Sequence, residues 1–168
     1  MLTRPDTVFT ELGTKTIEHG LADPLLSEFY EAVMSARPEE VQQKLKPFLP
    51  HLSLCSDKMS SDAPPPIFYV GGKCGQRELF GEDWATPTGT GPALRTPDPQ
   101  LELASAEGYR HALSGTPYYG YARTLVDVNG GKFEVAFERL IIAMRPSLKS
   151  DYRFCAYLGI IQDLHRKF

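Results

Sequence analysis

The fold of this chain is decided by the run from Pro117 to Leu164, which reads PYYGYARTLVDVNGGKFEVAFERLIIAMRPSLKSDYRFCAYLGIIQDL. Its pattern predicts three consecutive antiparallel strands, at Pro117–Val128, Lys132–Arg145 and Tyr152–Ile161. Asn129-Gly130-Gly131 favours a hairpin between the first two, because Asn and Gly adopt positive φ at little cost. Three such strands form a sheet, and the rest of the chain must cover it.

The middle strand of this sheet carries an unusual alternation. Its first half places Phe133, Val135 and Phe137 on one face, and its second half places Leu140, Ile142 and Met144 on the other. A regular strand cannot move its apolar set from one face to the other. We favour a bulge near Glu138-Arg139. The alternative is that the end of the strand is covered on both faces.

The upstream sequence predicts helices and two short strands. Asp-Pro pairs at Asp23-Pro24 and Asp98-Pro99 are helix start signals, with Asp as the N-cap and Pro in the first turn. They predict helices at Leu25–Ala36 and from Pro99 to Leu113. Shorter elements are expected as a helix from Pro38, a helical turn at Gln76–Phe80, and strands at His51–Cys55 and Ile67–Val70.

These elements define an α+β fold class. We expect a single five-stranded antiparallel sheet, with the helices on one face and an N-terminal helical extension. Residues 1–20 are weakly patterned and are expected to form an arm, and residues 21–168 are expected to form the domain. The Gly-rich segment Thr86–Gly91 lacks the Gly-Lys-Ser/Thr ending of a phosphate-binding loop. We favour a plain loop over a flexible lid for this segment.

Composition excludes several classes of protein. The chain has 168 residues, 42% of them hydrophobic, and a net charge of −3, which fits one globular domain. The absence of a basic tract argues against nucleic-acid binding. The sequence contains neither a signal-peptide pattern nor a run long enough to span a membrane, so we expect a cytoplasmic protein. Cys55, Cys74 and Cys155 lack metal-site spacing and are expected as free buried thiols.

In this order of elements the chain resembles a PAS domain of the bacterial single-domain kind. Four segments carry the resemblance: Pro47–Leu52 leading into the first strand, Glu78–Gly81, Gly108–Pro117, and Gly131–Ile142. The match covers Phe29 to Leu164 in order. The resemblance implies a sensory or regulatory module without enzymatic activity, which binds a signalling partner such as a histidine kinase or another two-component regulator. Proteins of this kind are linked with motility and cell-cycle control.

The sequence does not identify a cofactor. Flavin-adduct PAS domains carry a cysteine after the Phe-Gly turn, and residues 82–95 contain none. A haem ligand role for His111 is possible, but an exposed helix histidine is the simpler interpretation. Zinc is unsupported, because the histidines and cysteines show no metal-ligand spacing.

A ligand pocket, if present, is expected between the concave face of the sheet and a helical layer. Six side chains are candidates for its lining: Tyr69, Phe80, Trp84, Tyr109, Arg139 and Tyr157. Most of the aromatic residues are equally explained as ordinary core. Arg139 either turns into the pocket or pairs with Glu134 or Glu138 on the wet face, and we favour the pairing.

Tyr119 and Tyr121 are expected on an exposed face of the sheet, where they would contact a partner. Two other functions remain open. Phe29–Val33 and Arg37–Glu39 also resemble the opening helices of NTF2-like proteins, whose deep cavity holds an acid–base pair and binds or transforms small molecules. A homodimer joined through Met1–Gly20 is the other alternative.

Overall fold

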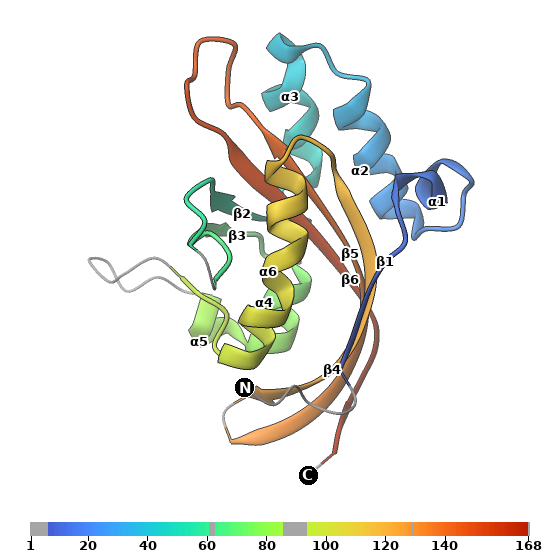
Figure 1. Cartoon of the computed structure of the whole chain (residues 1–168), viewed down its shortest axis with the longest axis vertical. Helices are drawn as coiled ribbons and strands as arrows, with labels where there is room; N and C mark the ends of the chain where they lie inside the picture. The colour runs from blue at the N-terminus through green and yellow to red at the C-terminus, as the bar shows by residue number, and fades with distance from the viewer. Residues whose placement is uncertain (1–6, 61–62, 86–93, 129, 168) are drawn as a thin grey trace.

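Three long antiparallel strands form the centre of the sheet, as the Pro117–Leu164 sequence predicts (Figure 1). In the computed structural model they are β4 (Tyr118–Val128), β5 (Gly131–Met144) and β6 (Phe154–Arg166). β6 continues to Arg166, beyond its predicted end at Ile161, because it stays paired with β5 along this length. The structure describes residues 7–60, 63–85, 94–128 and 130–167, so the loop predicted at Thr86–Gly91 lies outside the described residues.

Two short strands extend the sheet on the β6 side. β2 (Ser53–Ser56) pairs with both β3 (Ile67–Val70) and β6, which confirms that the short strands join the long ones. On the other side, β1 (Val8–Glu11) pairs with β4. The spatial order is β1-β4-β5-β6-β2-β3. The prediction of five strands is therefore wrong by one, because a four-residue strand carries too short an alternation to be recognised.

Residues 7–20 of the expected N-terminal arm form part of this body. β1 forms one edge of the sheet, and the short helix α1 (Thr14–Glu18) follows it. Ile17 on α1 is buried in the same cluster as Leu26 and Phe29. The described part of the expected arm therefore consists of a short helix and a strand, and the strand was not expected.

The remaining helices follow the predicted order. Apart from α1, the helical elements are α2 (Pro24–Met34), η1 (Pro38–Glu40), α3 (Val41–Leu45), η2 (Lys46–His51), α4 (Gly75–Phe80), α5 (Glu82–Ala85) and α6 (Pro99–Leu113), of which η1 and η2 are 3-10 helices.

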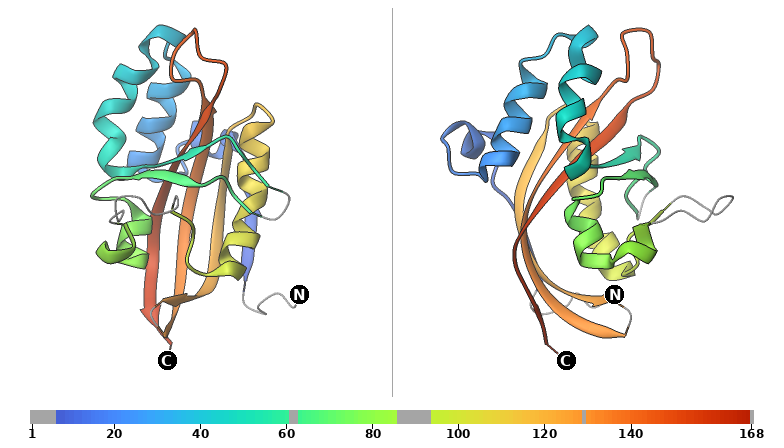
Figure 2. Two further views of the ribbon diagram at one scale, coloured as in Figure 1. Left: turned by 90° about the vertical axis from the view of Figure 1, so that its left-hand side faces the viewer. Right: turned by 180° about the vertical axis from the view of Figure 1, so that it is seen from behind.

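The helices cover both faces of the curved sheet, so the expectation that they gather on one face is wrong (Figures 1 and 2). On the convex face, α1, α2 and the α3–η2 segment pack against one cluster of sheet residues. On the concave face, α4, α5 and α6 pack against two others. Each layer buries a separate apolar set, and the sheet lies between them.

This arrangement explains the alternation in β5. The strand pairs with β4 without interruption from Tyr118↔Ile141 to Val128↔Gly131, so the predicted bulge near Glu138-Arg139 is wrong. The bulge lies instead on β6, where Gln162 is the extra residue between the partners of Ala136 and Phe137. The second half of β5 is buried on both faces. This was the alternative explanation for the change of apolar face along the strand.

The two Asp-Pro signals mark helix starts as predicted. Asp23 Oδ1 accepts hydrogen bonds from Leu25 N at 2.9 Å and Leu26 N at 3.4 Å. Asp98 Oδ1 caps α6 in the same way, and its Oδ2 also accepts from Asp127 N on β4, at 2.8 Å. Asp98 is buried, so this carboxylate fastens the start of α6 to the sheet.

We expect Asp98→Ala to lower the free energy of unfolding by about 2–3 kcal/mol, because it removes the helix cap and also the charged acceptor of the Asp127 N–H on β4. Asp23→Ala removes only a cap with its side chain and should cost about 1 kcal/mol. Urea denaturation of both variants measures the difference. Equal losses would show that the Asp98–Asp127 contact contributes nothing.

Candidate functional site

A cavity lies between the concave face of the sheet and the layer formed by α4 and α6. We define the concave face by Val135, Phe137, Arg139 and Ile141 of β5. The cavity is small, with a volume of about 40 Å³. Its polar lining is Gln76, Thr96, Ser105, Tyr109, Arg139 and Tyr157. Its apolar lining is Leu79, Phe80, Leu101, Phe137 and Ile161.

Arg139 is the charged group of this cavity. Its side chain is buried, with 2% of the residue exposed. Nη1 donates a hydrogen bond to Ser105 O at 3.0 Å, and Cζ lies over the rings of Phe9 and Tyr118 at 5.0 and 4.8 Å from their centroids. Aromatic faces attract a guanidinium through their quadrupole, so these two rings stabilise the buried charge in part.

The direction of Arg139 follows from the regular alternation of β5. Because β5 has no bulge at this point, Arg139 shares the concave face with Phe137 and Ile141, while Glu134 and Glu138 belong to the convex face. The favoured prediction, that Arg139 pairs with either glutamate, is therefore wrong. The alternative is correct, because Arg139 turns into the cavity. Gly108 makes room for the side chain, since a Cβ atom there would lie 2.7 Å from Arg139 Nη2.

Two tyrosines line the cavity beside Arg139. The rings of Tyr109 on α6 and Tyr157 on β6 stack with centroids 6.1 Å apart and an angle of 10°. Burial raises the pKa of both phenols, and the charge of Arg139 opposes the rise. Both groups are therefore neutral hydrogen-bonding side chains at physiological pH, unsuited to act as bases.

The structure brings together four of the six predicted ligand residues, namely Phe80, Tyr109, Arg139 and Tyr157. Trp84 is a neighbour of this group: its ring meets Phe80 at 4.9 Å, and its Nε1 donates to Arg95 O. Tyr69 lies away from the cavity, because its ring packs with the convex-face cluster and its hydroxyl donates to Leu49 O at 3.0 Å.

Sequence reasoning did not identify the remaining lining residues. Gln76 lies in the first turn of α4, and its Oε1 is buried without a hydrogen-bond partner in the described part of the chain. Ser105 contributes its backbone oxygen to Arg139. Neither residue type stands out in a sequence, and only the packing of α4 and α6 on the sheet brings them to Arg139.

The predicted partner residues have different environments. Tyr119 is buried on the convex face among residues of α1 and α2, so its assignment to an exposed face is wrong. Burial, with a contribution from the charge of Glu138, raises the pKa of Tyr119 to about 12. Tyr121 is half-buried further along β4, and Arg123 hydrogen-bonds to it and to Glu134.

Glu138 ties the convex helices to the sheet. Its Oε1 accepts from Asp23 N and its Oε2 from Gln162 Nε2, both at 2.6 Å. Burial raises the pKa of Glu138, and the negative charge of Asp23 adds to the rise, whereas the hydrogen bonds to the carboxylate oppose it. This carboxylate is buried away from the cavity and does not face Arg139.

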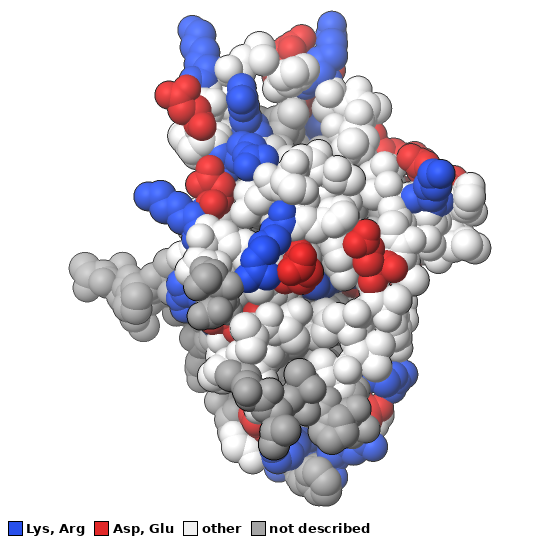
Figure 3. All heavy atoms as spheres, viewed as in Figure 1, with Lys and Arg blue, Asp and Glu red and all other residues white. Residues whose placement is uncertain are grey.

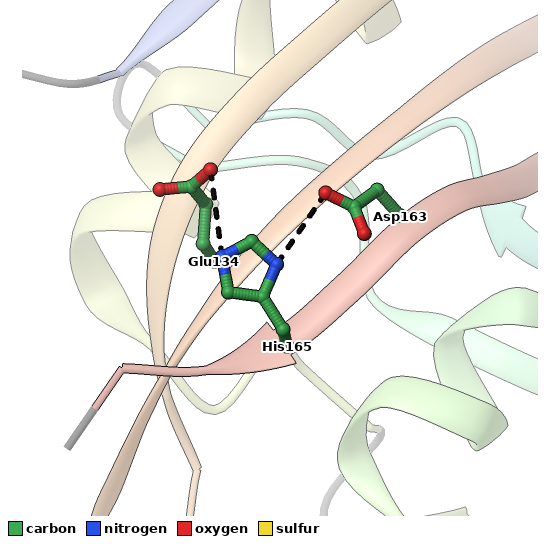
Figure 4. A group of neighbouring side chains, drawn as sticks. All are labelled: Glu134, Asp163 and His165. Atoms are coloured by element: carbon green, nitrogen blue, oxygen red, sulfur yellow. Dashed lines mark ion pairs between the residues drawn. The ribbon is translucent and has the colours of Figure 1, made fainter.

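Glu134, Asp163 and His165 form a cluster on the convex face of the sheet (Figure 4). The imidazole lies between the carboxylates, 3.8 Å from Glu134 and 3.4 Å from Asp163. Arg123 and Lys167 also contact Glu134, at 2.6 and 3.4 Å. Since these cations already neutralise Glu134, we interpret the cluster as an ion-pair network across β4, β5 and β6.

His111 does not line the cavity. It lies on α6 with Nδ1 3.6 Å from Glu11 Oε2, and its ring meets Tyr118 edge-on at 5.7 Å. The three cysteines are free and buried, as predicted. Burial raises the pKa of each thiol, that of Cys155 to about 12, so these groups remain protonated and unreactive.

Acidic and basic side chains are interspersed on the molecular face seen in Figure 3. Within the described residues, no helix combines the length and the apolar composition that crossing a membrane requires. No protein-family model matches this chain, and neither does any curated protein or solved structure.

We expect Glu138→Gln to change how stability depends on pH. A folded-state pKa above the unfolded value means that the folded state binds the proton more tightly, so wild-type stability falls as pH rises through the Glu138 pKa. Gln cannot ionise, so the free energy of unfolding of the variant should rise relative to wild type as pH increases above about 4, the pKa of an unfolded glutamate. Urea denaturation of wild type and variant at a series of pH values measures this difference in the free energy of unfolding.

Glu134→Gln is the matched control with the opposite sign. Burial disfavours ionisation of Glu134, but its hydrogen bonds to Arg123 and Lys167 outweigh burial and lower its pKa. Wild type should therefore gain stability over this variant as pH rises toward about 4, so its urea titrations are extended below that pH. If both variants show the same trend, the buried environment of Glu138 does not control its ionisation.

Proposed function

We propose that the protein is a non-enzymatic regulatory module of the PAS type, which binds a small ligand and a signalling partner. The order of elements supports the proposal: two short strands, short helices, a longer helix and three long strands, all joined in one antiparallel sheet. The single observation that carries it is the cavity between this sheet and α6, with Arg139 buried in its wall. A cavity that combines apolar walls with placed polar groups is typical of ligand binding.

The alternative is an NTF2-like protein or enzyme. Proton transfer in a cavity of that class needs a buried acid–base pair within reach of the substrate. Among the described residues, the lining of the cavity contains neither a carboxylate nor an imidazole, and its two tyrosines have raised pKa values. This lining supports a binding role in preference to an enzymatic one.

The open part of the convex face is the surface we propose for the partner. α1, α2 and α3 lie over one end of the sheet, and the far ends of β4, β5 and β6 extend beyond them (Figure 2). Tyr121, Arg123 and Glu134 belong to the part that these three helices leave uncovered, and they are only partly buried. The proposed partner is a cytoplasmic histidine kinase or another two-component regulator, acting in motility or cell-cycle control.

A homodimer is a second proposal for assembly. β1 is an edge strand, paired on one side only, and an edge of this kind can pair with a second copy. β1 and α1 pack on their own chain. The two copies would therefore pair through the free edges of their β1 strands, without swapping their N-terminal segments. Solution mass by light scattering decides it, and a monomer at high concentration would exclude this assembly.

We expect Tyr121→Ser to weaken capture of a histidine kinase by the tagged protein by about tenfold, since loss of a central aromatic side chain is costly in an interface. Tyr152→Ser is the control, because Tyr152 is an exposed tyrosine preceding β6, outside the proposed surface. Capture and the kinase autophosphorylation rate are measured together.

Equal capture by wild type and both variants would exclude the open convex face as the docking surface. If a purified panel of histidine kinases and response regulators shows neither capture nor a changed phosphorylation rate with the wild-type protein, the proposed regulatory function is wrong.

A further inference from the structure

The cavity contains a positive charge that the described residues do not balance. In the part of the chain that the structure describes, Arg139 forms no ion pair, although only 2% of the residue is exposed. Its one hydrogen bond to a described residue, Ser105 O, uses one of the five N–H groups of a guanidinium. Burying such a group is costly unless an anion and further acceptors compensate.

A second polar group in the same cavity also has no partner. Gln76 Oε1 is buried without a hydrogen bond among the described residues, and Gln76 lines the cavity together with Arg139. Buried acceptors in folded proteins are nearly always satisfied, by the protein, by water or by a ligand. A ligand that satisfies both groups must therefore supply a negative charge to Arg139 and a hydrogen-bond donor to Gln76.

The number of charges restricts the ligand. Arg139 is the only cation in the described lining, so a dianion such as phosphate or a dicarboxylate would keep one charge unpaired. A guanidinium fork matches a carboxylate in two parallel hydrogen bonds. An amino acid would bring an ammonium group beside the buried arginine, which like-charge repulsion disfavours. The donor for Gln76 is therefore better supplied by a hydroxyl.

The size and the walls of the cavity restrict the rest of the molecule. Its volume of about 40 Å³ is far below that of pockets for drug-sized ligands. Leu79, Leu101, Phe137 and Ile161 line it, so the body of the ligand meets apolar side chains.

We propose that the cavity binds a short-chain hydroxy monocarboxylate, whose carboxylate pairs with Arg139 and whose hydroxyl donates to Gln76 Oε1. This assignment names the ligand class of the proposed sensory module, and so it rests on that function. Binding to the purified chain involves no partner, so failure of this proposal and failure of partner capture are separate results.

Isothermal titration calorimetry of the full chain with lactate tests the proposal. Propionate, alanine, succinate and inorganic phosphate are the comparison ligands. We expect lactate to bind, propionate to bind about tenfold more weakly because it cannot satisfy Gln76, and the other three to show no binding. Equal binding of propionate would overturn the role of Gln76. Preference for phosphate or succinate, or no binding of lactate, would overturn the ligand class.

Gln76→Glu is the decisive variant, because it changes little in shape and places a carboxylate in the cavity with Arg139. An internal ion pair should reduce lactate affinity at least about tenfold. Gln100→Glu makes the same substitution at an exposed position of α6 and should leave affinity unchanged. Arg139→Lys keeps the charge but loses the fork, and should also weaken binding. Wild-type affinity in Gln76→Glu would overturn the assignment.

Discussion

The burial of β5 on both faces is the constraint on which the rest of the structure depends. This strand pairs with β4 and β6 along its length, and its second half contacts helices on either side. A strand without an exposed face must supply apolar side chains in both directions, and Leu140, Ile141 and Ile142 do so. The only charged residues in its buried part, Glu138 and Arg139, each need a specific environment for the same reason.

Local sequence signals predicted most of the elements. The Asp-Pro pairs located α2 and α6, and the alternation of apolar residues located the long strands. The placement of the helices depends on contacts between distant residues, which no local pattern contains. The consecutive apolar residues of β5 did indicate two covered faces, but the same pattern also fits a bulge, and only the uninterrupted pairing with β4 separates the two.

The candidate site was predictable to the extent that it consists of conspicuous residues on recognisable elements. Tyr109, Tyr157 and Arg139 fall at positions whose element and face can be inferred. Gln76 and Gly108 cannot be found in this way, because their roles come from packing: one meets the cavity where α4 approaches β6, and the other lets α6 close over a guanidinium. Tyr119 shows the converse error, since its burial requires the unpredicted position of α1 and α2.

The backbone of β5 also separates the two helical layers, so residues next to each other in the chain face opposite layers. Glu138 and Arg139 are neighbours in the chain, yet one contacts the start of α2 on the convex side and the other reaches Ser105 of α6 on the concave side. Because packed side chains leave little free space, a shift of this backbone toward one layer must loosen its contacts with the other. The two helical layers are therefore mechanically linked through the backbone of β5, although they share no apolar cluster.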